Sequence, residues 1–165
     1  MRALIAAGGR STRLRPITWT INKHLITLAN KPMLEHVIEK ITEAGITEIA
    51  ININPGETEV MTSYFGNGSR WGAKITYIEQ VGGAKGIAHA VDNAKSFLSG
   101  DSFLFFLGDN IVLGSIKHMK EKFEQENLEC LVALSLVKDP HRFGVPEFDE
   151  NKKIVRVIEK PADPP

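Results

Sequence analysis

The sequence predicts an α/β fold with a mostly parallel sheet, and three observations carry that prediction. Apolar stretches of strand length alternate with segments of helical periodicity along most of the 165 residues. The run SFLFFL at 102–107 is almost wholly apolar, as expected of a central parallel strand that is covered on both faces. Informative loops also follow the strand-like runs, and doubly wound sheets bind their ligands in such loops.

The predicted elements can be placed by their apolar patterns and their breakers. The first strand runs from Ala3 to Ala7 and breaks at the Gly8-Gly9 pair, and a helix with one apolar stripe begins at Pro32 and ends at Gly45. Two short strands at 144–149 and 153–160 are joined by a hairpin-like turn at 150–152. The remaining predicted strands cover 46–53, 73–80, 102–107 and 129–137, and the remaining helices cover 55–65, 87–98 and 115–127, with Ile87 among the inner residues of the second.

Length and charge bound the class of protein. A chain of 165 residues fits one domain, 1–165, with room for a proper core. Lys plus Arg (20) balances Asp plus Glu (20), which argues against nucleic acid or a membrane as the main partner. The basic residues near the start are therefore a local feature that favours a small anionic ligand. The first strand is too short for a signal peptide or a membrane span, and a cytoplasmic protein is expected.

The cysteine and the histidines give no catalytic signal. Cys130 is the only cysteine, which precludes a disulfide within the chain and suits a reducing cytoplasm. It lies in the apolar run CLVALSLV, so a buried and inert thiol is expected. The histidines show no metal-ligand spacing, and only His24, which follows Lys23, is expected near a ligand. The other histidines are His36, His89, His118 and His141.

The loop at 8–15 is the first candidate site. Its glycines let the backbone approach a ligand closely, and the arginines that follow offer planar donors to phosphate. The loop is not a Walker A sequence, since no Gly-Lys-Ser/Thr triplet closes it. It is not the dinucleotide fingerprint either, because Ser11 and Leu14 stand where later glycines would be needed. We expect it to bind a triphosphate; the alternative is a tight turn with solvated arginines.

Three further loops carry candidate side chains, each with a plainer alternative. Asp109 directly follows a buried strand, where a carboxylate can bind Mg²⁺ or simply cap the next helix. Gln80 ends a strand, and its amide offers the donor and acceptor that a pyrimidine edge requires, although a surface glutamine is the simpler reading. Glu159 and Lys160 could bind sugar hydroxyls and phosphate, or form a solvated pair.

These motifs together resemble a known family. The segment AAGGRSTRLRPIT, then Lys23, then ANKPM is similar to the signature GGxGTRLxPxT…K…KP of sugar-1-phosphate nucleotidylyltransferases. Further matches arrive in the family's order: GNGSRWG, YIEQ with GGAKG, FLGDN, DPHRFGVPEFD and IEKP. The ensemble most resembles glucose-1-phosphate thymidylyltransferases, which make dTDP-glucose from dTTP and glucose 1-phosphate. The resemblance implies a Rossmann-like, three-layer α/β/α sandwich.

The resemblance also implies roles for single residues. Arg13, Lys23 and Asp109 would be catalytic, with Mg²⁺ on Asp109, in an in-line attack of a sugar phosphate on the α-phosphorus that releases pyrophosphate. The implied partners are dTTP or UTP and a sugar 1-phosphate, without nucleic acid or membrane, and a homo-oligomer is among the expected states. The nucleotide would be bound by Gly8, Gly9, Ser11, Thr12, Arg13, Gln80 and Gly86, and the sugar phosphate by Gly144, Glu159 and Lys160.

The sequence departs from the family pattern at several points. Ser11 replaces a signature glycine, Ile26-Thr27 replaces a usual proline, and Pro146 suits only an edge strand or a bulge. The chain stops where family members continue to a second metal-binding aspartate, so a C-terminally truncated catalytic unit is expected. Two alternatives stay open: a UTP-using relative, and a nucleotide-binding or regulatory module without turnover. A dinucleotide-dependent oxidoreductase ranks last.

Overall fold

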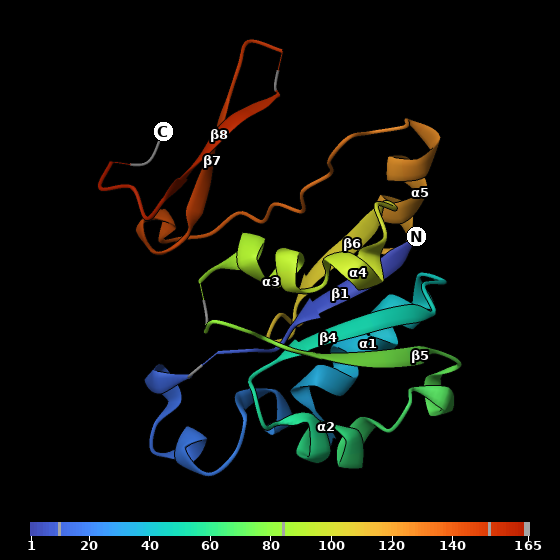
Figure 1. The fold of residues 1–165 in the computed structure, drawn as a ribbon. Helices are drawn as coiled ribbons and strands as arrows, with labels where there is room; N and C mark the ends of the chain where they lie inside the picture. The colour runs from blue at the N-terminus through green and yellow to red at the C-terminus, as the bar shows by residue number, and fades with distance from the viewer. Residues whose placement is uncertain (10, 84, 152, 164–165) are drawn as a thin grey trace. The chain divides into compact units, whose positions relative to one another are not determined.

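The described chain contains a four-stranded parallel sheet, two two-stranded hairpins and the helices between them (Figure 1). The computed structural model describes residues 1–9, 11–83, 85–151 and 153–163, and of Arg13 the backbone alone. The chain divides into two compact units, Met1–Leu128 and Glu129–Pro165. Among the described residues, no helix combines the length and the apolar character needed to cross a membrane.

The sheet of the first unit is parallel throughout. Its strands are β1 (Arg2–Ala6), β4 (Glu48–Ile53), β5 (Lys74–Glu79) and β6 (Phe103–Leu107), in the order β5-β4-β1-β6. The two inner strands, β1 and β4, are almost continuously apolar and buried, because helices cover both of their faces. The prediction of a mostly parallel α/β fold is confirmed.

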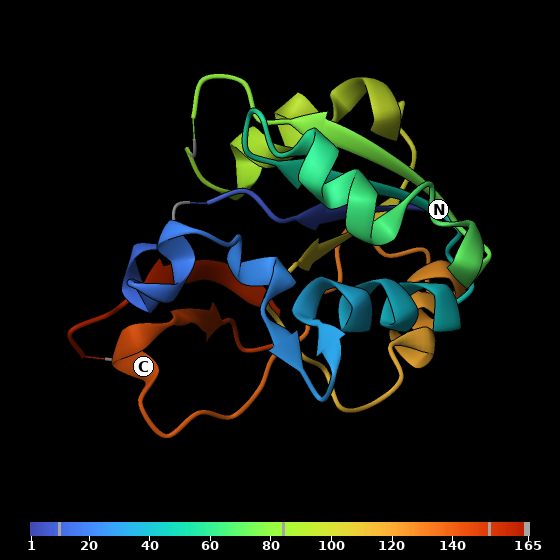
Figure 2. The ribbon, with the colours of Figure 1, turned by 90° about the horizontal axis from the view of Figure 1, so that it is seen from below.

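Helices form a layer on each side of this sheet (Figures 1 and 2). On one side lie α1 (Met33–Glu43) and α2 (Thr58–Phe65), whose apolar side chains share a core with alternate residues of β1 and β4. On the other side lie α3 (Ile87–Asn93) and α4 (Lys95–Leu98), packed on the remaining alternate residues. In α1 the buried residues are Leu34, Val37, Ile38 and Ile41, the helical stripe predicted from the sequence.

Short elements complete the chain. Three single turns of 3₁₀ helix, η1 (Thr12–Leu14), η2 (Ile17–Trp19) and η3 (Lys23–Leu25), lead from β1 toward α1. The small hairpin of β2 (Thr27–Leu28) and β3 (Lys31–Pro32) then delivers the chain to Met33. The other elements are η4 (Ser69–Trp71), α5 (Lys117–Gln125), η5 (Pro140–Arg142), β7 (Gly144–Phe148) and β8 (Ile154–Glu159).

The predicted strand at 129–137 is wrong. No residue of this run belongs to a strand in the structure, and Cys130 is exposed rather than buried. A β-strand needs a neighbour that accepts and donates its backbone hydrogen bonds, and within the described chain this run has none. Its alternating apolar side chains, Val132, Leu134 and Leu136, are exposed in consequence.

Two smaller expectations also change. The run at 102–107 was expected to be central, yet within the described residues β6 pairs with β1 alone and forms one edge of the sheet. The helix expected over 87–98 breaks at Ala94 into α3 and α4, and Ile87 is exposed. Pro146 lies where expected, in a two-stranded hairpin with a register shift next to it, between Glu147 and Phe148.

Candidate active site

The turns after the four parallel strands meet at one edge of the sheet. The register pairs Ala6 with both Asn52 and Leu107, and Ile53 with Glu79, so the strands end side by side. The Gly108 N–H donates to the Ala6 carbonyl at 2.9 Å, which extends the ladder into the loops. Side chains after β1, β4, β5 and β6 are thereby gathered at the edge where doubly wound sheets bind ligands.

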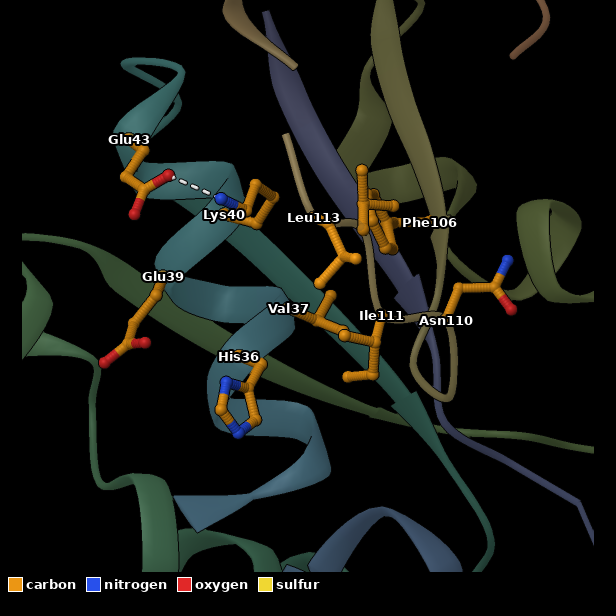
Figure 3. Close-up of a pocket in the computed structure, with 10 residues that line it drawn as sticks. His36, Val37, Glu39, Lys40, Glu43, Phe106, Asn110, Ile111 and Leu113 are labelled. Carbon is orange, nitrogen blue, oxygen red and sulfur yellow. Dashed lines mark hydrogen bonds and ion pairs between the residues drawn. The ribbon is translucent and has the colours of Figure 1, made fainter. Parts of the chain in front are cut away.

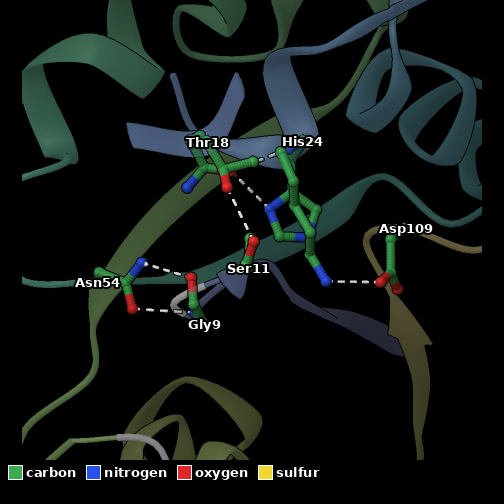
Figure 4. Close-up of polar contacts among 8 residues, drawn as sticks. Gly9, Ser11, Thr18, His24, Asn54 and Asp109 are labelled. Atoms are coloured by element: carbon green, nitrogen blue, oxygen red, sulfur yellow. Dashed lines mark hydrogen bonds and ion pairs between the residues drawn. The ribbon is translucent and has the colours of Figure 1, made fainter. Parts of the chain in front are cut away.

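The side chain of Asn54 fixes the backbone of the glycine loop after β1. The Gly9 N–H donates to Asn54 Oδ1 at 2.9 Å, and Asn54 Nδ2 donates to the Gly9 carbonyl at 3.3 Å (Figure 4). Ser11, which stands in place of a signature glycine, has φ 46° and ψ 36°, a left-handed conformation that strains a residue with a side chain. The Thr18 hydroxyl donates to the Ser11 carbonyl at 2.8 Å, which offsets part of this strain. The loop backbone is thus fixed by side chains from outside it.

Gln80 is buried against the same loop. A Cβ at position 8 would lie 2.5 Å from Gln80 Oε1, so a larger residue there would displace the Gln80 amide. Gln80 Nε2 donates to the Gly83 carbonyl at 2.8 Å, which fixes the amide with its oxygen toward Gly8. Gly86, the residue before α3, has φ 99°, a conformation that side-chain-bearing residues rarely adopt.

Lys23 and Asp109 form an ion pair across the edge, with Nζ 2.5 Å from Oδ2 (Figure 4). Lys23 stands at the first position of η3 and Asp109 follows β6, so 86 residues of chain separate them. Burial alone would raise the pKa of Asp109, but the hydrogen bond and charge of Lys23 and the nearby His24 outweigh it, and the pKa is lowered. The carboxylate is therefore ionised at neutral pH.

His24 lies beneath this pair and is almost completely buried. Its Nδ1 donates to Asn22 Oδ1 at 2.7 Å, and the same oxygen accepts the His24 N–H at 2.9 Å. The ring packs against Gly108, where a Cβ would come within 2.9 Å of His24 Cδ2. Burial, with the adjacent Lys23 charge, lowers the pKa of His24 to about 4 despite the opposing effect of Asp109.

We expect His24 to make the fold acid-sensitive. The pKa of His24 is 6.5 in the unfolded chain and about 4 in the folded one. Above pH 6.5 the group is neutral in both states and does not reduce the free energy of unfolding. Between pH 6.5 and 4 the unfolded chain binds a proton that the folded chain refuses, which costs about 3 kcal/mol over the window. Urea unfolding in metal-free buffer at pH 7 and pH 4.5 measures the loss, and His24→Gln should remove it. An NMR titration that places the His24 imidazole near pH 6.5 would contradict the expectation.

The predicted sugar-phosphate residues come together in the second unit. Gly144 and Glu159 are paired in the β7–β8 hairpin, and a Cβ on Gly144 would lie 3.3 Å from Glu159 Oε2. Lys160 Nζ is 3.2 Å from Glu159 Oε1, and Lys160 has φ 50°. The hairpin therefore presents a carboxylate and a cation next to each other.

The structure thus groups most of the predicted residues. Gly8, Gly9, Lys23, Gln80 and Asp109 share the sheet edge, and Ser11 and Thr12 lie on the loop that leaves it. The side chain of Arg13 and all of Arg10 lie outside the described residues. Of the residues at 159–161, expected in a loop after a strand of the parallel sheet, Glu159 is the last residue of β8 and the next two follow it, so they belong to the hairpin and not to the parallel sheet. Sequence reasoning missed Asn22, Asn54 and Glu57, although the Asn-Pro-Gly-Glu turn also follows a strand and the same rule points to it.

A pocket of about 240 Å³ lies between α1 and the segment after β6 (Figure 3). Val37, Phe106, Ile111 and Leu113 give it apolar walls, and Lys40 at its rim is paired with Glu43 at 2.8 Å. The lining also places two carboxylates, Glu39 and Glu43, against this one lysine, so the pocket does not suit a triphosphate.

A divalent cation at the edge would depend on Asp109. Within the described ranges, no three His, Cys, Asp or Glu side chains come together in a way that could hold a metal ion. Mg²⁺ is commonly held by one or two carboxylates together with substrate phosphates and water. The ionised Asp109 carboxylate at the end of β6 fits that mode of binding, with the phosphates supplying the other oxygens.

The chain is a three-layer α/β protein with a parallel sheet and a glycine loop after its first strand (Figure 1). The nucleotidyl transferase family matches it over residues 2–165. The chain belongs to that family.

Similar proteins include a glycan biosynthesis nucleotidyltransferase and a glucose-1-phosphate thymidylyltransferase. The chain is 41% identical over 165 residues to the low-salt glycan biosynthesis nucleotidyltransferase Agl11 of Haloferax volcanii, covering all of this chain and 46% of that protein. It is also 41% identical to a glucose-1-phosphate thymidylyltransferase of Streptomyces antibioticus, covering 99% and 46%. The chain thus spans about half the length of these curated relatives.

Solved structures share the fold. A protein from Bacillus anthracis, assigned as a glucose-1-phosphate thymidylyltransferase and crystallised with sucrose, superposes with a TM-score of 0.92 at 36% identity, covering 99% of this chain and 66% of that one. A UDP-glucose pyrophosphorylase in complex with UDP-glucose superposes with a TM-score of 0.79 at 23% identity, covering 97% and 69%. At that identity the second likeness concerns the fold alone.

Proposed function

We propose that this chain transfers a nucleotidyl group from dTTP to glucose 1-phosphate, giving dTDP-glucose and pyrophosphate. The observation that carries the proposal is the Lys23–Asp109 pair, which lies at the sheet edge together with the glycine loop and the buried Gln80. The 41% identity to a glucose-1-phosphate thymidylyltransferase supports the choice of substrates.

The chemistry is an in-line displacement. An oxygen of the sugar phosphate forms a bond to the α-phosphorus, the bond from that phosphorus to the oxygen bridging to the β-phosphate breaks, and pyrophosphate leaves with the electron pair. No protein nucleophile is required, so positioning and charge neutralisation carry the catalysis. Lys23, with Arg13, offsets the repulsion between the two approaching anions. Mg²⁺, when held by Asp109 and the phosphates, would neutralise further charge at this position.

The glycine loop binds the phosphates of the nucleotide, and Gln80 binds its base. Gly8, Ser11 and Thr12 bring backbone N–H groups to the phosphates. Gly9, whose N–H is donated to Asn54, lets the backbone approach them closely. Gln80 Nε2 is engaged with Gly83, so its Oε1 remains to accept the N3–H of thymine or uracil, which cytosine lacks. Gly86 lets the backbone bend next to the base. Binding of the sugar 1-phosphate is assigned to the hairpin residues Gly144, Glu159 and Lys160.

Pyrophosphate release, measured with each of the four dNTPs and UTP, with glucose 1-phosphate and with or without Mg²⁺, tests the proposal. We expect Mg²⁺-dependent release with dTTP and little with dCTP. UTP is included because thymine and uracil present the same hydrogen-bonding edge to Gln80. Release that is faster with UTP than with dTTP would favour a uridylyltransferase. Nucleotide binding without release in any combination would favour a binding or regulatory module and overturn the transferase assignment.

A further inference from the structure

The turn that follows β4 lies between the two loops of the candidate site. It has the sequence Asn54-Pro55-Gly56-Glu57, and the Glu57 N–H donates to the Asn54 carbonyl at 3.2 Å. Proline at the second position and glycine with φ 81° at the third are the residues that a type II turn demands. The backbone of this turn is therefore defined by its own sequence.

The turn is also fixed from the side of β5. Glu79, the last residue of β5, accepts the Gly56 N–H at 3.0 Å and the Thr58 hydroxyl at 2.7 Å through the same oxygen. These bonds, that of Thr58 first, lower the pKa of Glu79, so the carboxylate stays ionised and in place at neutral pH. The turn has a rigid support in the sheet.

From this support two side chains reach the loops of the site. Asn54 takes both the N–H and the carbonyl of Gly9. Glu57 Oε2 accepts Asn22 Nδ2 at 2.9 Å and the Asn54 N–H at 3.2 Å. Asn22 in turn holds His24 through its amide oxygen and caps η3, the turn that begins with Lys23. A single carboxylate oxygen thus links the glycine loop to the lysine turn.

We propose that Asn54 and Glu57 are positioning residues that set the placement of Lys23 relative to the glycine loop. The proposal rests on the proposed function, in which the glycine loop binds the nucleotide phosphates and Lys23 offsets charge at the reacting phosphorus. The separation between a bound phosphate and its cation has to be held within a fraction of an ångström, because a displacement of about 1 Å can cost 10²-fold in rate. Neither residue needs to touch a substrate for this role.

Backbone amide exchange in the nucleotide-free protein is the first test. In Glu57→Ala the Gly9 and His24 amides should both exchange at least tenfold faster than in the parent protein. The Ala7 amide, which donates to the Asn52 carbonyl at 2.8 Å, should be unchanged. Both donors reach the same oxygen of Glu57, so Glu57→Gln can present an amide oxygen to both and should restore most of the protection. Glu59→Ala removes the same charge from an exposed position on α2 and should change neither amide.

Steady-state kinetics is the second test. We expect Glu57→Ala to lower kcat for pyrophosphate release about tenfold with the KM for glucose 1-phosphate unchanged, Glu57→Gln to recover most of the loss, and Glu59→Ala to match the parent. Equal protection of Gly9 and His24 in the parent and Glu57→Ala, or unchanged kcat with altered exchange, would overturn the inference while leaving the proposed function standing. A parent without pyrophosphate release would defeat the proposed function, and the exchange experiment would still decide whether Glu57 couples the two loops.

Discussion

Replacing Lys23 by alanine is expected to lower the rate of pyrophosphate release about a hundredfold, equivalent to ~3 kcal/mol in the barrier. The reason is electrostatic: two phosphates must approach each other, and Lys23 is the cation that η3 holds at the sheet edge, within 2.5 Å of Asp109. Its loss removes a positive charge from the place where the two phosphates meet. Nucleotide affinity should fall by less than the rate, because the charge matters most when pyrophosphate departs.

The control for Lys23 is a lysine with the same kind of partner outside the site. Lys31 Nζ lies 2.5 Å from Glu39 Oε1, so Lys31→Ala also breaks an ion pair and removes one charge. That variant should retain the parent rate. A rate in Lys23→Ala that stays within a few-fold of the parent, with the fold intact by circular dichroism, would remove Lys23 from the catalytic assignment.

Local sequence was sufficient to predict an element whose backbone hydrogen bonds form within the segment itself or with a neighbouring strand of the same chain. The apolar runs of β1 and β4, the stripe of α1 and the proline that suits the β7–β8 hairpin could all be read directly. For Ser11 the sequence left two outcomes open, because a serine in place of a signature glycine either adopts positive φ or changes the loop; the structure shows φ 46°.

Prediction from sequence failed where the structure of a segment depends on the strand beside it and not on its own composition. The run at 129–137 has strand composition, yet composition does not supply the neighbouring strand that its N–H and C=O groups require. Cys130 was expected inside for the same reason and is exposed. The edge position of β6 is a property of strand order, which apolar content cannot reveal.

The site shows the same division. The residues that would meet a ligand were predicted from motif and position, whereas those that hold the motif in place were not. Asn54 and Glu57 belong to an ordinary turn sequence, and their reach toward Gly9 and Asn22 appears only when β1 and β4 lie side by side. His24 was noted because it follows Lys23 in the sequence. Its burial next to the Lys23–Asp109 pair depends on tertiary packing, which the local sequence does not show.

Asp109→Asn should produce opposite effects on nucleotide binding with and without Mg²⁺. The asparagine keeps the shape of the side chain and an oxygen that can accept from Lys23, but it removes the charge that Mg²⁺ requires. Without Mg²⁺, dTTP should bind more tightly than to the parent, because a negative charge next to the phosphates is gone and Lys23 is released from its ion pair. With Mg²⁺, dTTP affinity should fall below that of the parent and pyrophosphate release should drop roughly hundredfold or more.

Calorimetric titration of dTTP with EDTA and with Mg²⁺ measures both effects. Asp101→Asn is the matched control, since Asp101 precedes the opposite end of β6 and pairs with Arg2 at 3.5 Å. An Asp109→Asn protein whose Mg²⁺ dependence is the same as that of the parent would place the metal elsewhere. In that case Asp109 would only hold Lys23 in place. The loss of rate in Asp109→Asn should then be the same at every Mg²⁺ concentration, because it would come from the weakened contact with Lys23. The opposite signs of the two binding effects separate these cases, because a purely structural carboxylate changes affinity in the same direction under both conditions.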